Sequence, residues 1–351
     1  MDSYICAQMS QYNLQKMQER FANLFPGYDI DMNELFLMIM QGKAGSAVRM
    51  FFEGIMEGIK GEMGGMRSVM ITIIVIGIVS ALFSSFSDIF AGQQVSQVGF
   101  YFLYLFLIAV LTKAFVYVSE IAVGTIENVV IFVKLFIPTW FMAVGAASGT
   151  ATAGIYYQVM LLAAYLIESF LLSAVIPFVY SYVVLALLNG IWAEERLTLL
   201  LDFMKKGVEI ALKITMGAIT SFSLVQAVIV PVLDELKISS FRKAVSYVPG
   251  IGNVAEGVTE LVIGSAVLIK NSLGVLLLVL LLLACVIPLL KILMVVGLVK
   301  LGAAITGIIS DKRISGCSDR VGEGCFLLFR CVFTAAALFI IVVAIVAYGV
   351  R

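Results

Sequence analysis

The chain has 351 residues, of which 62% are hydrophobic and only 13% are charged. A soluble domain is about half apolar, so this composition indicates an integral membrane protein in contact with membrane lipids. The 23 basic residues balance 23 acidic ones, which leaves no polybasic field for nucleic acid. Histidine is absent, which excludes Ser-His-Asp and Cys-His catalysis and imidazole metal ligands. We therefore expect a protein that is not an enzyme, needs no cofactor and binds no nucleic acid.

Residues 1–68 are expected to form a separate amino-terminal segment, because they carry more charge than the rest of the chain. The first residues, Met1 to Tyr4, show neither the basic nor the apolar region of a secretory signal. Between Val48 and Met63 the apolar positions recur every three or four residues, which predicts a helix with one apolar face. That helix either lies on the membrane, docks a partner or covers the protein's own core.

Residues 69–351 are expected to form the transmembrane domain, because long hydrophobic runs dominate there. A membrane-spanning helix needs about 20 mostly apolar residues. Four runs suffice for one crossing each: 69–90, 98–118, 207–232 and 325–349. Two longer runs, about 119–190 and 234–302, contain prolines. This pattern predicts an all-α, polytopic membrane protein with about six to eight membrane-embedded helical segments. We expect loops in the charged stretches near 191–206, 234–245 and 311–324, whose equal basic counts give no orientation.

Four of the six prolines form two pairs with one spacing, Pro138 with Pro177 and Pro249 with Pro288. Each pair is 39 residues apart, and the second pair follows the first by 111 residues. Proline removes a backbone donor and clashes with the preceding turn, so each pair predicts a broken membrane element. The spacing indicates an internal repeat, over about 98–206 and 209–320, before the last span. The number of crossings in each broken element decides whether the repeats are parallel or inverted, and both remain open.

Ionisable residues at membrane depth cost several kcal/mol unless they are paired or hydrated. Lys113, Lys213 and Arg330 are expected near helix ends, from which their side chains reach the interface. Glu168 and Lys270 lie deeper, and either a hydrated transport pathway or a structural pair between them or with backbone carbonyls accounts for them. The candidate structural or functional residues are Pro138, Glu168, Pro177, Pro249, Gly252, Lys270, Asn271, Gly274 and Pro288.

Several segments of the chain resemble one protein family, the stage III sporulation protein AE family of endospore-forming bacteria. The most specific segments are Tyr247 to Asn253 and the stretch from Gly264 to Gly274 that contains Lys270 and Asn271. Three further segments resemble the family: Phe136 to Pro138, Pro288 to Lys291, and the Phe25 to Gly27 turn followed by Gln41 to Lys43. The resemblance covers essentially the whole chain. Members of this family commonly begin with a secretory signal, from which the present chain departs.

The resemblance implies a subunit of the mother-cell stage III A complex in the outer forespore membrane. In this family the complex joins stage II sporulation protein Q of the forespore and forms a channel or secretion-like apparatus for late forespore development. Residues 1–68 would then lie outside the mother-cell cytoplasm, and a homo-oligomer is compatible with such an apparatus. The alternatives are a secondary transporter of a small solute, since proline-broken repeats build many transporter sites, and a purely structural scaffold.

Overall fold

A computed structural model describes residues 14–25, 32–41, 71, 75, 78, 93–148, 150–191, 196–245, 252–309 and 312–349. Every regular element in these ranges is a helix. Two short helices come first, α2 (Leu14–Leu24) and α3 (Met32–Met40). The others are α6 (Gln93–Ser148), α7 (Thr150–Ile167), the π-helix η1 (Glu168–Val175), α8 (Ile176–Asn189), α9 (Thr198–Val245), α10 (Gly252–Ile309) and α11 (Lys312–Gly349).

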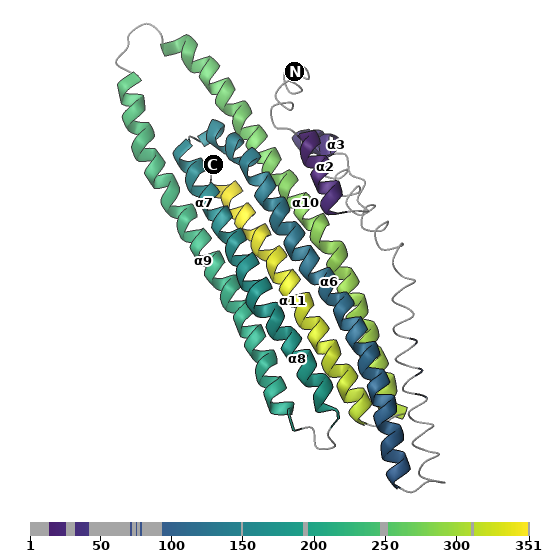
Figure 1. Ribbon diagram of the computed structural model, residues 1–351. Helices are drawn as coiled ribbons and strands as arrows, with labels where there is room; N and C mark the ends of the chain where they lie inside the picture. Colours follow the sequence, from purple (N-terminus) through teal and green to yellow (C-terminus); the bar gives the residue numbers. More distant parts are fainter. Residues whose placement is uncertain are drawn as a thin grey trace.

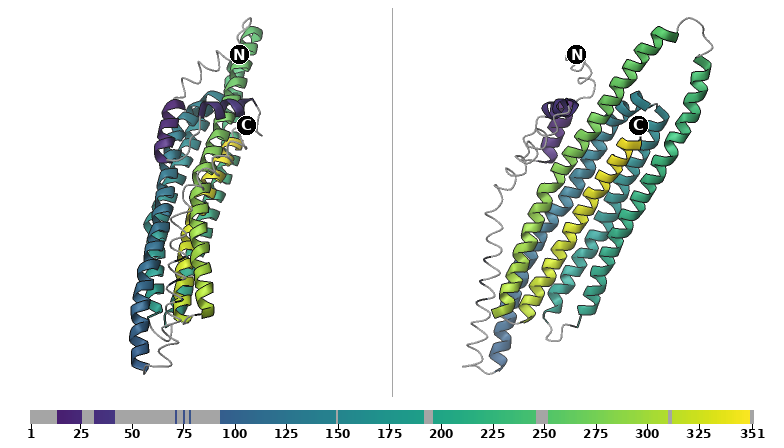
Figure 2. Two further views of the ribbon diagram at one scale, coloured as in Figure 1. Left: turned by 90° about the vertical axis from the view of Figure 1, so that its right-hand side faces the viewer. Right: turned by 180° about the vertical axis from the view of Figure 1, so that it is seen from behind.

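The long helices form an up-and-down bundle in which the chain reverses direction after each pass (Figure 1). The three segments α7, η1 and α8 follow one another without a reversal and make a single pass. As a result, α6, α9 and α11 run in one direction, while α7 to α8 and α10 run in the other. The bundle is wider than it is thick (Figure 2).

The described residues contain five helical stretches that are long and apolar enough to cross a membrane. These stretches are Val98–Gly145, Met160–Asn189, Thr198–Leu224, Val267–Ile308 and Lys312–Ile345. The prediction of an all-α polytopic membrane protein is thereby confirmed. The expected span at 69–90 falls almost wholly outside the described residues. Pro249 and the amphipathic helix expected between Val48 and Met63 lie entirely outside them.

Helix α11 occupies the centre of the bundle and packs against α6, α7, η1, α8, α9 and α10. Its inward face is an apolar stripe at helical spacing that includes Val321, Cys325, Leu328 and Phe339, all fully buried. Lipid tails are as apolar as these side chains, so close packing and polar contacts between helices have to stabilise such a bundle. The contacts of α11 with its neighbours therefore set the architecture.

The amino-terminal helices pack against the bundle. The ring of Phe21 on α2 and the ring of Phe25, directly after α2, contact Phe132 of α6. The amide of Asn128 donates a hydrogen bond of 2.8 Å to the Leu24 carbonyl. Helix α3 packs on α10 and buries Met32, Leu35 and Phe36. Within residues 1–68, these two helices are thus joined to the transmembrane bundle.

The prolines act differently from the expectation of two broken elements. Helices α6 and α10 continue through Pro138 and Pro288, so neither residue breaks its helix. Among the prolines that the structure describes, Pro177 alone coincides with a change of helix type, because it lies in the first turn of α8, directly after η1. The Ile176 N–H donates to the Leu171 carbonyl in the wider π-helical pattern. The wider turn relieves the clash that the Pro177 ring would otherwise make with the turn before it.

The helix boundaries do not repeat at the proposed offset of 111 residues. Helix α6 ends at Ser148 and α7 begins at Thr150, so the same boundary would recur between residues 259 and 261. Residues 259 to 261 lie inside α10, which runs unbroken from Gly252 to Ile309. The expected loops also differ from the structure, because 198–206 and 234–245 belong to α9 and 312–324 belongs to α11. The charged stretches extend the helices beyond their apolar segments instead of forming loops. Charged side chains are compatible with a helix where they find partners of opposite charge.

Candidate functional site

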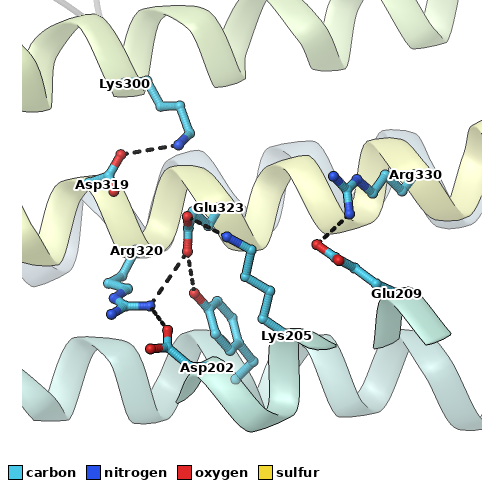
Figure 3. Close-up of polar contacts among 9 residues, drawn as sticks. Asp202, Lys205, Glu209, Lys300, Asp319, Arg320, Glu323 and Arg330 are labelled. Carbon is cyan, nitrogen blue, oxygen red and sulfur yellow. Dashed lines mark hydrogen bonds and ion pairs between the residues drawn. The ribbon is translucent and has the colours of Figure 1, made fainter. Parts of the chain in front are cut away.

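The main polar feature of the bundle is a row of charged side chains between the parallel helices α9 and α11 (Figure 3). Asp202, Lys205 and Glu209 occupy positions i, i+3 and i+7 of α9, which places them on one face. Arg320, Glu323 and Arg330 share the facing side of α11, and Tyr182 of α8 reaches the same row. We call these seven residues the α9–α11 seam.

Each charge in the α9–α11 seam has an opposite charge on the other helix. Arg320 Nη1 lies 2.5 Å from Asp202 Oδ1, and Lys205 Nζ lies 2.6 Å from Glu323 Oε1. One to two turns further along, Arg330 Nη1 lies 2.5 Å from Glu209 Oε1. The sign order minus, plus, minus along α9 therefore meets plus, minus, plus along α11. This complementarity holds the two helices in one register.

Glu323 connects three helices. Besides Lys205, its second carboxylate oxygen accepts a hydrogen bond of 3.1 Å from the Tyr182 hydroxyl of α8. The same oxygen lies 3.6 Å from Arg320 Nη1 on its own helix. The Glu323 side chain is 18% exposed, so water competes weakly for these partners. Tyr182 itself is fully buried.

The close approach of α8 to α11 beside Glu323 depends on a glycine. A Cβ atom at Gly324 would collide with the Cγ2 atom of Val183. Glycine lets the helix backbones approach to a distance that any larger residue would prevent. The hydrogen bond from Tyr182 to Glu323 and the glycine at 324 thus belong to one contact.

A further ion pair, outside the α9–α11 seam, joins α6 to the π-helix. Lys134 Nζ lies 2.5 Å from Glu168 Oε2, and both side chains are 39% exposed. Glu168 is the first residue of η1, so the pair ties the start of the irregular turn to α6. Ser119 of α6 and Tyr180 of α8 hydrogen-bond on the other side of Pro177. Two contacts with α6 therefore flank the irregular segment, one at its first residue and one in the second turn of α8.

Comparison with known proteins identifies the family. A model of the family described as stage III sporulation protein AE matches residues 30–349. The chain belongs to this family. It is also similar to the stage III sporulation protein AE of Bacillus subtilis (strain 168), with 20% identity over 280 residues, 78% of this chain and 69% of the relative. No solved structure matches the chain. The resemblance noted in the sequence is thus confirmed.

Of the residues singled out from the sequence, those whose surroundings the structure describes do not gather into one site. Glu168 meets Lys134, as described above, and Pro138 and Pro177 are exposed. Along α10, Asn271 is exposed, Gly274 is buried and Pro288 is half-buried. Gly252 begins α10 and Lys270 lies within it, and the surroundings of both residues fall outside the described part. Gly252 and Pro288 are 36 residues apart on one helix, a rise of about 54 Å.

Sequence reasoning missed the α9–α11 seam because it assigned most of these charges to loops. It also expected Arg330 at a helix end, whereas Arg330 lies well inside α11 and pairs with Glu209. The complementary sign order at helical spacing is the signal that would have identified the seam. Lys134, the partner of Glu168, carried no comparable signal, because nothing in its spacing relates it to η1.

The chemistry of the α9–α11 seam is that of a structural contact. Its charges sum to zero, and each is neutralised by a fixed partner. Among the described residues, no group of three or more His, Cys, Asp or Glu side chains could hold a metal ion. Removing one partner of such a half-buried pair leaves the other without its counter-charge, which costs more than the pair contributes. The seam is therefore suited to fixing helix positions.

Proposed function

We propose that this chain is a membrane subunit of the mother-cell stage III A sporulation complex. The observation that carries the proposal is family membership across residues 30–349, together with five candidate membrane spans in the described residues. In this proposal the chain lies in the outer forespore membrane, contacts other stage III A proteins and is linked through them to stage II sporulation protein Q. It supports late forespore development as part of a channel or secretion-like apparatus, without an enzymatic activity of its own.

The charge pairs of the bundle support a subunit role over a transporter role. An alternating-access transporter needs elements that separate and re-form contacts around a central site. Here α8, α9 and α11 are joined at Glu323, and α6 is joined to η1 and α8 on both sides of Pro177. These contacts favour helices that move as one body, which is the behaviour of a platform within a larger assembly.

The test is localisation and complex formation in sporulating cells of the native host. A tagged full-length chain at its own locus should surround the forespore after engulfment, and its purification should recover the other stage III A proteins. An unrelated multi-pass mother-cell membrane protein with the same tag is the control. Even distribution with no recovery of those proteins would contradict the proposal. Ion-coupled solute uptake by the purified chain in liposomes would instead support the secondary transporter.

A further inference from the structure

Several charged side chains on the outside of the bundle, Lys113 of α6 among them, have no ion-pair partner in the part of the chain that the structure describes, and four of them form an acidic and a basic pair. Glu120 and Glu127 lie on α6, and Lys206 and Lys213 lie on α9. All four are exposed, and none forms an ion pair with a described residue. They belong to two candidate membrane spans, Val98–Gly145 and Thr198–Leu224. Charged side chains on the outer face of a membrane bundle are strongly disfavoured unless something neutralises them.

The acidic pair and the basic pair have the same spacing. Glu120 and Glu127 are seven residues apart, as are Lys206 and Lys213. Seven residues are close to two helical turns, so the two charges of each pair lie above one another on one face of their helix. Helices α6 and α9 run in the same direction and lie on opposite sides of α11 (Figure 1). One side of the bundle therefore presents the acidic stripe of Glu120 and Glu127, which Lys113 precedes by seven residues, and another side presents a basic stripe of equal length.

The two stripes also lie at the same level along the bundle, which a chain of contacts establishes. Ser119 of α6 bonds Tyr180 of α8. Two residues further along α8, Tyr182 bonds Glu323, which pairs with Lys205 of α9. Residues 119 and 205 are thus within about one helical turn of each other in height. Glu120 and Lys206 are the next residues of the two helices and share that level.

The surroundings of both stripes are apolar. Beside the acidic stripe, Val116 is 40% exposed and Ile131 is 43% exposed. Beside the basic stripe, Phe203, Ile210 and Ile214 are 71%, 55% and 65% exposed. On such a surface the apolar side chains provide close packing with a partner, and the charges select one orientation of that partner.

We infer that the occupant of these faces is a second copy of the chain, with α6 of one copy against α9 of the next. In this arrangement Glu120 pairs with Lys206 and Glu127 pairs with Lys213. The two helices run parallel, as they do within one bundle. The contact joins different faces, so it is heterologous and generates a ring if the rotation closes and a filament if it does not. A two-fold contact of α6 with α6, or α9 with α9, would instead oppose like charges.

Cysteine cross-linking distinguishes these arrangements. Two full-length chains with different tags, both with Cys6→Ser, are co-expressed, one with Glu120→Cys and the other with Lys206→Cys. Four of the native cysteines, Cys285, Cys317, Cys325 and Cys331, are buried and free. Oxidation of membranes should give a disulfide-linked dimer that carries both tags. Glu120→Cys paired with Lys312→Cys, an exposed lysine at the start of α11, should give none. A dimer formed only between two Glu120→Cys chains, or no dimer at all, would overturn the inference.

A charge exchange supplies the second test, on purified full-length chain in detergent with no other sporulation protein present. Lys206→Glu with Lys213→Glu should weaken self-association at least tenfold, and adding Glu120→Lys with Glu127→Lys should restore it. Lys113→Gln is the matched control, because Lys113 shares the exposed stripe of α6 and precedes Glu120 by seven residues. Loss of association without restoration would overturn the inference. Because this assay requires no complex, its result is separate from the proposed function.

Discussion

Glu323 is the residue at which the contacts of the α9–α11 seam converge. Its carboxylate meets Lys205 of α9, Arg320 of its own helix and the Tyr182 hydroxyl of α8. A half-buried cation whose acceptor is removed keeps its desolvation cost and loses its compensation. The stability of the bundle should therefore be more sensitive to Glu323 than to a charge on its surface.

We predict that Glu323→Gln lowers the free energy of unfolding by about 1–3 kcal/mol, because Lys205 loses its counter-charge. Asp319→Asn is the matched control, since Asp319 pairs with Lys300 at 3.1 Å and is 52% exposed. The control should lower the free energy of unfolding by less than about 1 kcal/mol, because an exposed ion pair contributes little to stability. Thermal unfolding of the purified chain in detergent measures both. Equal decreases in the free energy of unfolding for the two variants would show that the burial of Glu323 adds nothing to the stability of the bundle.

At the residue scale, the sequence allowed only part of this site to be predicted. Glu168 stood out because no other charge is near it in the chain, and it does form an ion pair. Its partner Lys134 is 34 residues away, and only the packing of η1 on α6 brings the two together. The α9–α11 seam was not predicted for the same reason, because its partners are far apart in the chain. Lys205 and Glu323, for example, are 118 residues apart.

At the scale of elements, Pro177 is associated with a π-helix, whereas Pro138 lies in a continuous α-helix. We predict that Pro177→Ala lets η1 relax to α-helical bonding, which turns the following residues of α8 by roughly 100°. Tyr180 and Tyr182 would leave Ser119 and Glu323, lowering the free energy of unfolding by about 1–3 kcal/mol. Pro138→Ala should instead raise it by about 1 kcal/mol, because an exposed proline is removed from a helix interior.

Thermal unfolding of the purified chain tests whether the two proline variants change the free energy of unfolding in opposite directions. Cross-linking of Ser119→Cys with Tyr180→Cys adds a positional readout, because the pair should link efficiently in the parent chain and poorly with Pro177→Ala. A parent-like yield in the Pro177→Ala background would show that the proline does not set the π-helix.

The contact of α8 with α11 provides a third prediction at this scale. Gly324→Ala should destabilise the bundle by about 1–3 kcal/mol, because its Cβ would collide with Val183 and overpack the contact. Gly297→Ala on α10 is the matched control, because a Cβ there meets nothing within 4 Å. The control should be neutral or slightly stabilising, since alanine favours a helix over glycine. Similar unfolding temperatures for the two variants would contradict the close approach at Gly324.

The sequence predicted well which helices exist, but it did not predict how long they are. The apolar runs predicted helices at α6, α9, α10 and α11, because about 20 apolar residues suffice to identify a span. The helices are longer, with 56 residues in α6 and 58 in α10. Prolines and charges that normally end a helix are accommodated here by neighbouring helices, and a single sequence does not show which helices are neighbours.

At the scale of the whole molecule, a helix of 58 residues is about 87 Å long, whereas the apolar layer of a bilayer is about 30 Å thick. The bundle therefore extends well beyond the apolar layer. This length suits a family whose members act in a sporulating cell, where the chain is proposed to contact further proteins beside its own membrane. The order of the passes and the central place of α11 were not evident from the sequence, because they depend on contacts between distant helices.

The most direct test of this account is sporulation in the native host with the seam altered at the pair of Glu209 and Arg330. Strains carry Glu209→Gln, Arg330→Gln or both, and the yield of heat-resistant spores and the amount of membrane-inserted protein are measured. Each single variant leaves one half-buried charge unpaired, so we predict a reduction of at least tenfold in spores at normal insertion, with development stopping after engulfment. The double variant leaves no unpaired charge and should recover most of the yield. Wild-type yields in both single variants, or no recovery in the double variant, would contradict a sporulation subunit whose helices are held by the α9–α11 seam.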